Sequence, residues 1–326
     1  MKAILLRRPG GPEALDYADV PDPVPADGQV LVRAQAIGIG KPDVLWRTGV
    51  YRWLPPLPAI PGIEMAGVIE RAGCGVSGLA VGEKVLVYHL RGGCYAELIA
   101  CDASSVLPLP AQIDVDEAVA IPNYEVAWAL LNEAARGINP RTIYVNGAAG
   151  GVGSAIVQLC RAAGIEVIAG AGSAAKCAFC AGEGAAHTID YSRENVVERV
   201  QALTGGRGVD LILDQVVGGN FTDTLKMMAP LGLIVSYNML GGFPDKDLFR
   251  EMRANLPLSP GVRCFTMHSY DHDPAGRRRI ETETLALIAA GAVKPVVYRR
   301  LPLAEVRRAH ELLDAREVMG KLVLKP

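Results

Sequence analysis

The stretch Asn146–Gly153, which reads Asn-Gly-Ala-Ala-Gly-Gly-Val-Gly, decides the fold of much of this 326-residue chain. The apolar run Thr142–Asn146 predicts a strand that leads into it, and the pattern over Gly153–Ala163 predicts a helix that leads out of it. A glycine-rich turn in this context is far more informative than the same glycines alone, because strand, turn and helix together form one βα unit.

A loop of this kind suits a phosphate group. Gly150 would let the backbone approach a diphosphate, and Gly153 would let the helix pack closely on the strand. The start of the helix adds unpaired N–H groups and a partial positive charge. We therefore interpret this segment as a dinucleotide loop, although a purely structural glycine turn is the alternative. Its expected cofactor-binding residues are Ala149, Gly150, Gly151, Val152 and Gly153.

Strands and helices alternate on both sides of this loop. This alternation predicts a parallel, doubly wound sheet of the Rossmann type, and the nearly continuous apolar strands fit burial on both faces. We place this α/β domain at residues 122–268. Its further expected strands are Glu166–Ala169, Val209–Asp214, Leu233–Tyr237 and Arg263–Met267, and its further helices are Ala174–Gly182 and Phe221–Met228.

The residues before Ile121 follow another pattern, with short runs rich in Val and Ile between Gly and Pro residues. This pattern predicts antiparallel strands that close into a small β-barrel. The runs are Ala3–Leu6, Val30–Ala36, Ala66–Arg71, Lys84–Tyr88 and Tyr95–Ala100. Beyond residue 268 we expect the helix Arg277–Ala290, the strand Val296–Arg299, the helix Ala304–Ala315 and the strand Leu322–Leu324. Residues 1–121 and 269–326 are therefore expected to form one domain.

The strand after the loop indicates which dinucleotide binds. An NAD site places an Asp or Glu at the end of this strand, where it holds the ribose 2′-hydroxyl. No acidic residue occurs between Glu166 and Glu183, whereas Ser173 and Lys176 supply a hydroxyl and a cation. These two groups suit a 2′-phosphate and favour NADP(H). The alternative is that Ser173 only caps the next helix and Lys176 only faces solvent.

The composition excludes several classes of protein. The formal net charge is −2 and aromatic residues make up 6% of the chain, so neither a basic surface nor a stacking platform for nucleic acid is indicated. No apolar run is long enough for a membrane helix or a signal peptide. The seven cysteines are scattered and odd in number, unlike a secreted disulfide framework. We expect a cytoplasmic protein with reduced cysteines.

Several short motifs follow one another in a fixed order along the whole chain. They are Ala36–Gly38, Arg47–Tyr51, Pro61–Ile69, Gly82–Val85, Gly93–Glu97, Ala149–Gly153, Gly208–Asp214, Val217–Gly219 and Gly320–Leu324. In this order and spacing the chain resembles the medium-chain dehydrogenase/reductase superfamily, and most closely its zinc-independent quinone oxidoreductase branch. The resemblance implies that the N-terminal domain is a GroES-like catalytic β-barrel.

Zinc members of the superfamily hold their catalytic metal with a Cys and a His in two of these motifs. This chain has Gly40 and Ile63 at the corresponding positions, and neither can bind a metal. The cysteine-rich lobe of the family's structural zinc is missing as well. The pair Cys177 and Cys180 falls in a predicted helix, and we expect two half-buried helix cysteines rather than a metal or redox site. Without a Lewis acid, hydride transfer favours acceptors whose product anion is stabilised by conjugation.

The resemblance also implies further site residues. The 2′-phosphate pocket would gain Tyr191 and Arg316, and Gly218, Asn238 and Phe265 fall on loops that would meet the rest of the dinucleotide. Tyr51 lies in a Gly-Val-Tyr sequence similar to one in enoyl thioester reductases, where a tyrosine stands near the substrate carbonyl. A phenol there could donate a hydrogen bond or a proton to a developing enolate. The alternatives are surface packing for Tyr191 and Arg316, and packing beside Trp53 for Tyr51.

The resemblance implies an NADPH-dependent oxidoreductase that transfers hydride to a quinone or another activated α,β-unsaturated carbonyl, with no nucleic-acid or membrane partner. Gly40, Leu45 and Val126 depart from the family by removing polar groups from the expected cleft. An enoyl-CoA-type reductase is an alternative that basic residues at the cleft mouth would favour, with Arg33, Arg47 and Arg52 as candidates. A non-catalytic NADPH-binding protein is another. We also expect a homodimer, formed through the edge strand near Arg263–Met267.

We predict that NADPH binds at least about tenfold more tightly than NADH, since about 1.4 kcal/mol from one pair of polar contacts suffices for that ratio. Replacement of Lys176 by Ala should weaken NADPH by about 1.5–3 kcal/mol, the range of a charged hydrogen bond, and leave NADH nearly unchanged. Fluorescence titration of both cofactors measures the two affinities. Equal affinity of the unmodified chain for both cofactors would contradict the prediction.

Overall fold

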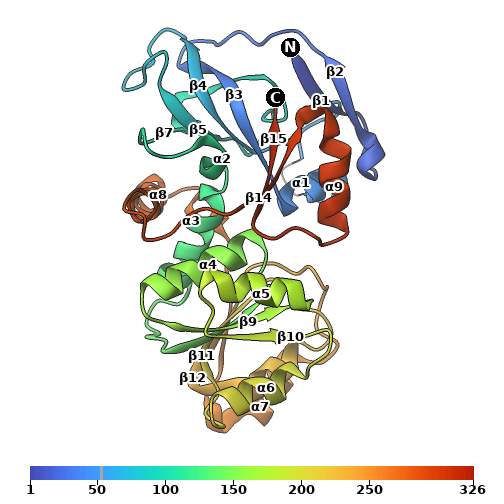
Figure 1. The fold of residues 1–326 in the computed structure, drawn as a ribbon, viewed down its shortest axis with the longest axis vertical. Helices are drawn as coiled ribbons and strands as arrows, with labels where there is room; N and C mark the ends of the chain where they lie inside the picture. Colours follow the sequence, from blue (N-terminus) through green and yellow to red (C-terminus); the bar gives the residue numbers. More distant parts are fainter. Residues whose placement is uncertain (52–53) are drawn as a thin grey trace. The chain divides into compact units, whose positions relative to one another are not determined.

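The computed structural model describes residues 1–51 and 54–326, and the described chain divides into two compact units. The first unit comprises Met1–Ile121 and Pro295–Pro326, and the second comprises Pro122–Lys294. Each unit has its own buried apolar cluster, one around Ile37, Met65 and Tyr95 and the other around Ile168, Ile212 and Ile234. Figure 1 shows both units, with the chain coloured from blue at the N-terminus to red at the C-terminus.

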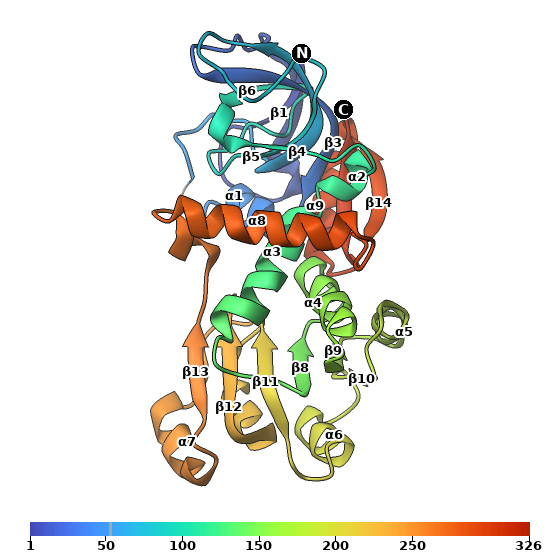
Figure 2. The same cartoon turned by 90° about the vertical axis from the view of Figure 1, so that its left-hand side faces the viewer.

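The second unit is built on a six-stranded sheet in which every pair of neighbours is parallel. The strand order is β10-β9-β8-β11-β12-β13, so the order reverses between β8 and β11 (Figure 2). This confirms the predicted Rossmann architecture. The strands are β8 (Thr142–Asn146), β9 (Glu166–Ala171), β10 (His187–Asp190), β11 (Val209–Asp214), β12 (Met228–Ser236) and β13 (Gly261–Cys264).

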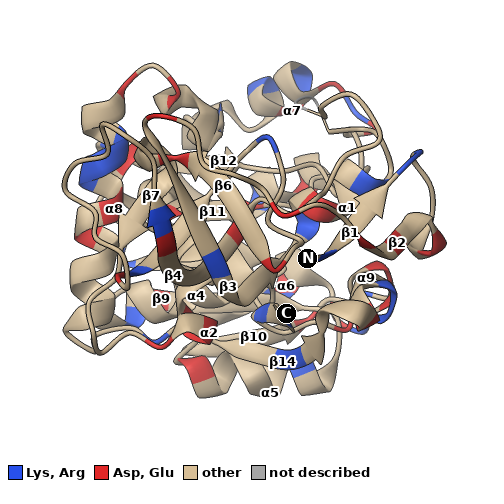
Figure 3. Cartoon of the chain, turned by 90° about the horizontal axis from the view of Figure 1, so that it is seen from above, with Lys and Arg blue, Asp and Glu red and all other residues tan. Residues whose placement is uncertain are grey.

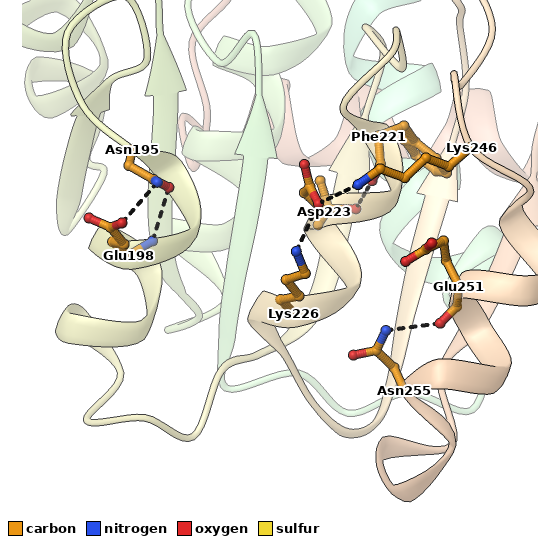
Figure 4. A network of polar contacts seen from close by, with 9 residues as sticks. Asn195, Glu198, Phe221, Asp223, Lys226, Lys246, Glu251 and Asn255 are labelled. Atoms are coloured by element: carbon orange, nitrogen blue, oxygen red, sulfur yellow. Dashed lines mark hydrogen bonds and ion pairs between the residues drawn. The ribbon is translucent and has the colours of Figure 1, made fainter.

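Helices connect these strands. The connections between successive strands include α4 (Gly151–Ala162), α5 (Ala174–Glu183), α6 (Val196–Leu203) and α7 (Leu248–Ala254), while α3 (Ile121–Ala129) precedes the sheet and α8 (Pro274–Ala289) follows it. A short π-helical turn, Leu130–Ala134, continues α3. Side chains cap most of these helices at their N-termini, as Asn195 does for α6 by accepting a hydrogen bond from Glu198 N (Figure 4).

Several elements of this unit differ from the sequence prediction. Strand β10 and helices α3, α6 and α7 were not predicted. Strand β10 has only four residues and begins with the polar pair His187 and Thr188. The predicted helix Phe221–Met228 is a 3₁₀ segment, Phe221–Met227. Within it the Thr224 hydroxyl donates to the Phe221 carbonyl oxygen, a local bond that competes with regular α-helical pairing.

A cluster of charges holds this 3₁₀ segment in place. Asp223 accepts hydrogen bonds from Lys226 (3.0 Å) and from Lys246 (3.3 Å), which comes from the loop before α7 (Figure 4). All three side chains are partly exposed, so each pair stabilises the fold only modestly.

Helix α8 packs with the second unit, whereas the sequence pattern predicted that everything after residue 268 belongs to the first. Arg277 on α8 donates to the buried carboxylate of Glu125 at 2.7 Å, and Arg279 donates to Glu133 at the same distance. These contacts to α3 and to the π-helical turn move the boundary to Pro295. Sequence periodicity could place the helix but not its partners.

The first unit consists mainly of antiparallel strands, as predicted. Its larger sheet has the order β14-β15-β3-β4-β5-β7, and β6 also pairs with β3. Positive and negative segments are interspersed along the ribbon (Figure 3). The strands are β1 (Lys2–Leu6), β2 (Leu15–Asp19), β3 (Gln29–Ile39), β4 (Glu64–Ala72), β5 (Lys84–Tyr88), β6 (Leu98–Asp102), β7 (Val106–Pro108), β14 (Val297–Pro302) and β15 (Lys321–Lys325).

Three helices complete this unit: α1 (Lys41–Arg47), α2 (Val115–Ala118) and α9 (Val306–Asp314). Arg47 ties α1 to the end of α9, because it is 3% exposed and donates to Asp314 at 2.7 Å. In the described residues no helix is both long and apolar enough to cross a membrane. All seven cysteines have free thiols, and Cys180 is fully buried while Cys177 is partly exposed.

We predict that Gly153→Ala destabilises the protein by about 1–3 kcal/mol, the usual cost of overpacking. A Cβ at this position would lie 2.6 Å from Gly147 O and 2.7 Å from the carbonyl carbon of Ala148, and backbone atoms cannot move aside easily. Gly182→Ala is the matched control, because a Cβ there meets nothing within 4 Å. The control should gain about 0.5–1 kcal/mol from the lower entropy of its unfolded chain. Urea unfolding measures both, and equal effects would contradict the prediction.

Candidate functional site

The predicted dinucleotide loop joins β8 to α4 at the point where the strand order reverses. Ligands of open parallel sheets bind at such a point, beyond the carboxyl ends of the strands. Gly150 is the N-cap residue of α4, and no side chain caps this helix. The Ser154 amide donates to Gly150 O at 2.8 Å, so the amides of the first turn, Gly151–Gly153, have no acceptor within the helix. These amides suit an anion.

The structure also explains the glycines of the loop. Gly147 has a left-handed φ of +74°, which favours glycine. Gly153 is required by the close approach of α4 to the backbone of Gly147 and Ala148. A Cβ at Gly150 would be 3.5 Å from both Gln215 Nε2 and Gly147 O, an ordinary contact distance. Gly153 therefore has the packing role that the sequence predicted.

Three residues of the predicted 2′-phosphate pocket gather at the ends of β9 and β10, which are neighbours in the sheet. Ser173 is the N-cap of α5, and its Oγ accepts from Lys176 N at 3.3 Å. The Tyr191 amide donates to Ala171 O at 3.0 Å, and its hydroxyl would be 2.9 Å from a Cβ at Gly172. Ser173 does cap the helix, as the alternative held, but its O–H is still able to donate.

The loops after β11, β12 and β13 carry the next three predicted residues. Gly218 is buried with φ +77°, and its amide donates to Gly242 O at 3.0 Å. Asn238 Oδ1 accepts from Met239 N at 2.8 Å, and the Phe265 amide donates to Ser236 O at 2.9 Å. These loops follow adjacent strands and belong to the same edge of the sheet as the dinucleotide loop.

The remaining two predicted residues belong to the first unit. Arg316 follows α9 and adopts a left-handed φ of +57°. Tyr51 follows α1, and its ring lies 6.4 Å from the ring of the buried Trp46, measured between centroids. Trp53, the packing partner considered from the sequence, lies outside the described residues, as does Arg52.

The positions that hold zinc in other members have no metal donors here. Gly40 begins α1, and Ile63 is 4% exposed. The ammonium of Lys321 lies close to Gly40, because a Cβ at Gly40 would be 3.6 Å from Lys321 Nζ. The same ammonium pairs with the buried carboxylate of Glu64. A fixed cation there would repel Zn²⁺, so these residues do not fit the metal. Groups of three or more potential ligands are also missing from the described chain.

Lys321, Glu64 and Asp43 form a buried cluster, and burial shifts the pKa values of Lys321 and Asp43. Desolvation lowers the pKa of Lys321 to about 8 and raises the pKa of Asp43 to about 6, although each charge favours the charged form of the other. Asp43 is held in place by its Oδ2, which accepts from Gly40 N at 2.8 Å. Gly38 makes room for Glu64, because a Cβ there would lie 2.7 Å from Glu64 Cγ. Asp43, Glu64 and Lys321 lie far apart in the sequence, so their cluster was not predicted.

Two further polar residues at the dinucleotide loop were missed. Gln215 follows β11 and donates through Nε2 to Gly147 O at 3.0 Å. Asn123 on α3 lies against Gly151, where a Cβ would be 3.0 Å from Asn123 Cγ. The available signal for Gln215 was its position, because the residue after the fourth strand adjoins the loop wherever the strand order reverses.

Comparison with known proteins gives the family. The alcohol dehydrogenase GroES-like domain matches residues 26–111, and a zinc-binding dehydrogenase domain matches residues 183–324. The quinone oxidoreductase of Pseudomonas aeruginosa is 33% identical, with 97% of each chain covered. That of Rattus norvegicus is 30% identical over 99% of this chain and 97% of the relative.

The chain belongs to the medium-chain dehydrogenase/reductase superfamily. Its relatives place it in the zinc-independent, quinone oxidoreductase-like branch. Among solved structures, the Escherichia coli quinone oxidoreductase in complex with NADPH matches with a TM-score of 0.91 and 29% identity, with 100% of both chains covered. A structure described as an NAD-dependent alcohol dehydrogenase matches with a TM-score of 0.89 and 30% identity, also over 100% of both chains.

The fold of this family member therefore does not by itself select the cofactor or the substrate, since neighbours of almost equal similarity carry different names. The choice depends on particular side chains. Both of the relatives named above are quinone oxidoreductases, whereas other similar proteins are named synaptic vesicle membrane protein VAT-1 homolog.

Proposed function

We propose that this family member is an NADPH-dependent, zinc-independent reductase of quinones or other activated α,β-unsaturated carbonyls. The observation that carries the proposal is the end of β9, where Ser173, Lys176 and Tyr191 gather and where the chain itself carries no acidic residue between Glu166 and Glu183. A hydroxyl, an ammonium and a phenol suit a 2′-phosphate, and a carboxylate would repel it. Arg316 is a proposed fourth member of this pocket.

The cofactor supplies the hydride, and the chain's own residues bind and orient it. The amides of Gly151, Val152 and Gly153 would receive its diphosphate, in the way helix N-termini receive anions. Ala149 and Gly150 would let it approach, and the loops of Gly218, Asn238 and Phe265 would meet the adenine, diphosphate and nicotinamide parts of the cofactor. The NADPH complex of the Escherichia coli structural neighbour supports this assignment.

The residues beside Gly40 support the choice of an activated acceptor. Gly40 and Ile63 stand at the positions of metal ligands, and the buried ammonium of Lys321 lies beside Gly40 and pairs with Glu64. A simple ketone or alcohol gains little from such a site, because its oxyanion needs strong stabilisation. A quinone or an enone forms an anion that conjugation already stabilises, so hydride transfer to it demands less of the protein.

Two other functions were open from the sequence. An enoyl-CoA-type reductase would need basic groups for the CoA phosphates, but Arg33 pairs with Glu70 at 2.6 Å and Arg47 is buried against Asp314. These contacts make the CoA alternative less favourable. A non-catalytic NADPH-binding protein would share the whole pocket at β9 and β10, so only the rate of NADPH oxidation distinguishes it from a reductase. The homodimer through β13 and the cytoplasmic location stay predictions.

The deciding experiment follows NADPH oxidation with a panel of quinones, enones and enoyl-CoA thioesters. We expect turnover with quinones and enones, and no loss of activity in a metal chelator. With NADPH deuterated at C4, an activated alkene should gain one deuterium on carbon, from one face of the cofactor only. Binding of NADPH without turnover of any acceptor would favour the non-catalytic alternative, and a label that comes from solvent at the hydride position would contradict direct transfer.

We predict that Tyr51→Phe lowers kcat/KM by about 10–100-fold if the phenol donates to the developing oxyanion, the range such donors contribute. Tyr17→Phe is the matched control, because Tyr17 is 45% exposed on β2 of the same unit. Steady-state kinetics with the best acceptor of the panel measures both variants. Unchanged kinetics in Tyr51→Phe would reduce Tyr51 to a packing residue beside Trp46.

A further inference from the structure

Gln215 occupies a special position in the second unit. It is the first residue after β11, and β11 and β8 are the two neighbouring strands between which the strand order reverses. Asp214 before it is 1% exposed, and its Oδ1 accepts from Asn146 Nδ2 and from the amides of Val216 and Val217. These bonds fix the backbone on both sides of Gln215, so its side chain leaves the sheet in a defined direction.

That side chain contacts the dinucleotide loop. Gln215 Nε2 donates to Gly147 O at 3.0 Å, and the same oxygen accepts from Gly150 N at 3.2 Å. A Cβ at Gly147 would lie 2.6 Å from Nε2, and one at Gly150 would lie 3.5 Å from it. The amide group therefore fills the space beside both glycines and closes the turn between them.

The first half of the turn is held by a backbone carbonyl oxygen of β9. The amides of Gly147 and Ala148 both donate to Gly170 O, at 3.0 and 2.9 Å. Gly170 fixes the first half of the turn, and Gln215 fixes the carbonyl that orients the second half. The second half leads directly into the three unpaired amides of Gly151–Gly153.

The charge of the side chain matters as much as its bond. Gln215 and Asn123, which approach the loop from β11 and α3, are both neutral amides. A carboxylate of similar shape at either position would face a bound anion and could not donate to a carbonyl oxygen. Neutral amides hold the turn without opposing the negative charge of a diphosphate.

We propose that Gln215 is a positioning residue for the cofactor's diphosphate, acting through the Gly147–Gly150 turn. The inference rests on the proposed function, because it takes a dinucleotide as the ligand of this loop. It differs from the role of Lys176 in a measurable way. NADPH and NADH carry the same diphosphate, so Gln215 should affect both equally, whereas Lys176 should affect only the cofactor with a 2′-phosphate.

The experiment compares two substitutions, Gln215→Met and Gln215→Glu. The first keeps the length of the side chain but removes the donor, and we expect about 5- to 10-fold weaker binding of both NADPH and NADH, the range of one neutral hydrogen bond. The second adds a negative charge, and we expect a larger loss that shrinks as salt is added, because the new repulsion is screened. The ratio of NADPH to NADH affinity should not change in either variant.

Adenosine 2′-phosphate serves as the probe that separates positioning from a general structural role. It carries the 2′-phosphate but no diphosphate, so its affinity should be unchanged in both variants. Gln201→Met and Gln201→Glu are matched controls: Gln201 on α6 also donates its amide to a backbone carbonyl, that of Lys226. The controls should leave all three affinities unchanged.

Three outcomes would overturn the inference. Unchanged dinucleotide affinity in both Gln215 variants would show that the bond to Gly147 does not position the ligand. A parallel loss of adenosine 2′-phosphate binding, with a lower Tm, would show a structural role instead. Failure of the unmodified chain to bind either dinucleotide would remove the proposed function, and this inference with it, before any variant is measured.

Discussion

The contact between α4 and the turn that precedes it is the constraint on which the second unit depends. The helix approaches Gly147 and Ala148 so closely that position 153 has no space for a Cβ. This approach aims the start of the helix at the edge of the sheet where the strand order reverses. The unpaired amides of the first turn, the left-handed Gly147 and the bond from Gln215 all follow from that placement.

A second constraint organises the first unit. Lys321, Glu64 and Asp43 are each less than 5% exposed, on β15, β4 and α1. Buried charges of this kind add little net stability, but the loss of one partner would leave the other charge unpaired at considerable cost. The three charges therefore favour one particular packing of β15, β4 and α1 and add little to the overall stability of the unit. Gly38 and Gly40 keep the space around it free of side chains.

These two constraints connect the fold to the chemistry that we propose. Members of one family share the barrel and the sheet, and neighbours of nearly equal structural similarity bear the names of different enzymes. In this chain two local features bear on the proposal: no acidic residue occurs between Glu166 and Glu183, and an ammonium lies beside Gly40. Function in this family is thus set by a few side chains on a common framework.

Much of the framework followed from the sequence by itself. The loop at Asn146–Gly153, the alternation of strands and helices and the residues Ser173 and Lys176 are local patterns, and local patterns depend on backbone periodicity and on the chemistry of single residues. The resemblance of the chain's ordered motifs to a known family indicated the family, and it also indicated that Gly40 and Ile63 stand where zinc members carry metal ligands. Strand β10 was not predicted from the sequence, because four residues that begin with two polar side chains carry little periodic signal.

Only the tertiary structure decided which distant residues meet. Gln215 and Asn123 at the loop, Lys321 beside Glu64, and α8 against Glu125 join residues far apart along the chain. No pattern in one sequence encodes such contacts, because they depend on strand order, register and the direction in which each element leaves the sheet. Periodicity fixes what a segment becomes, and packing fixes what it touches.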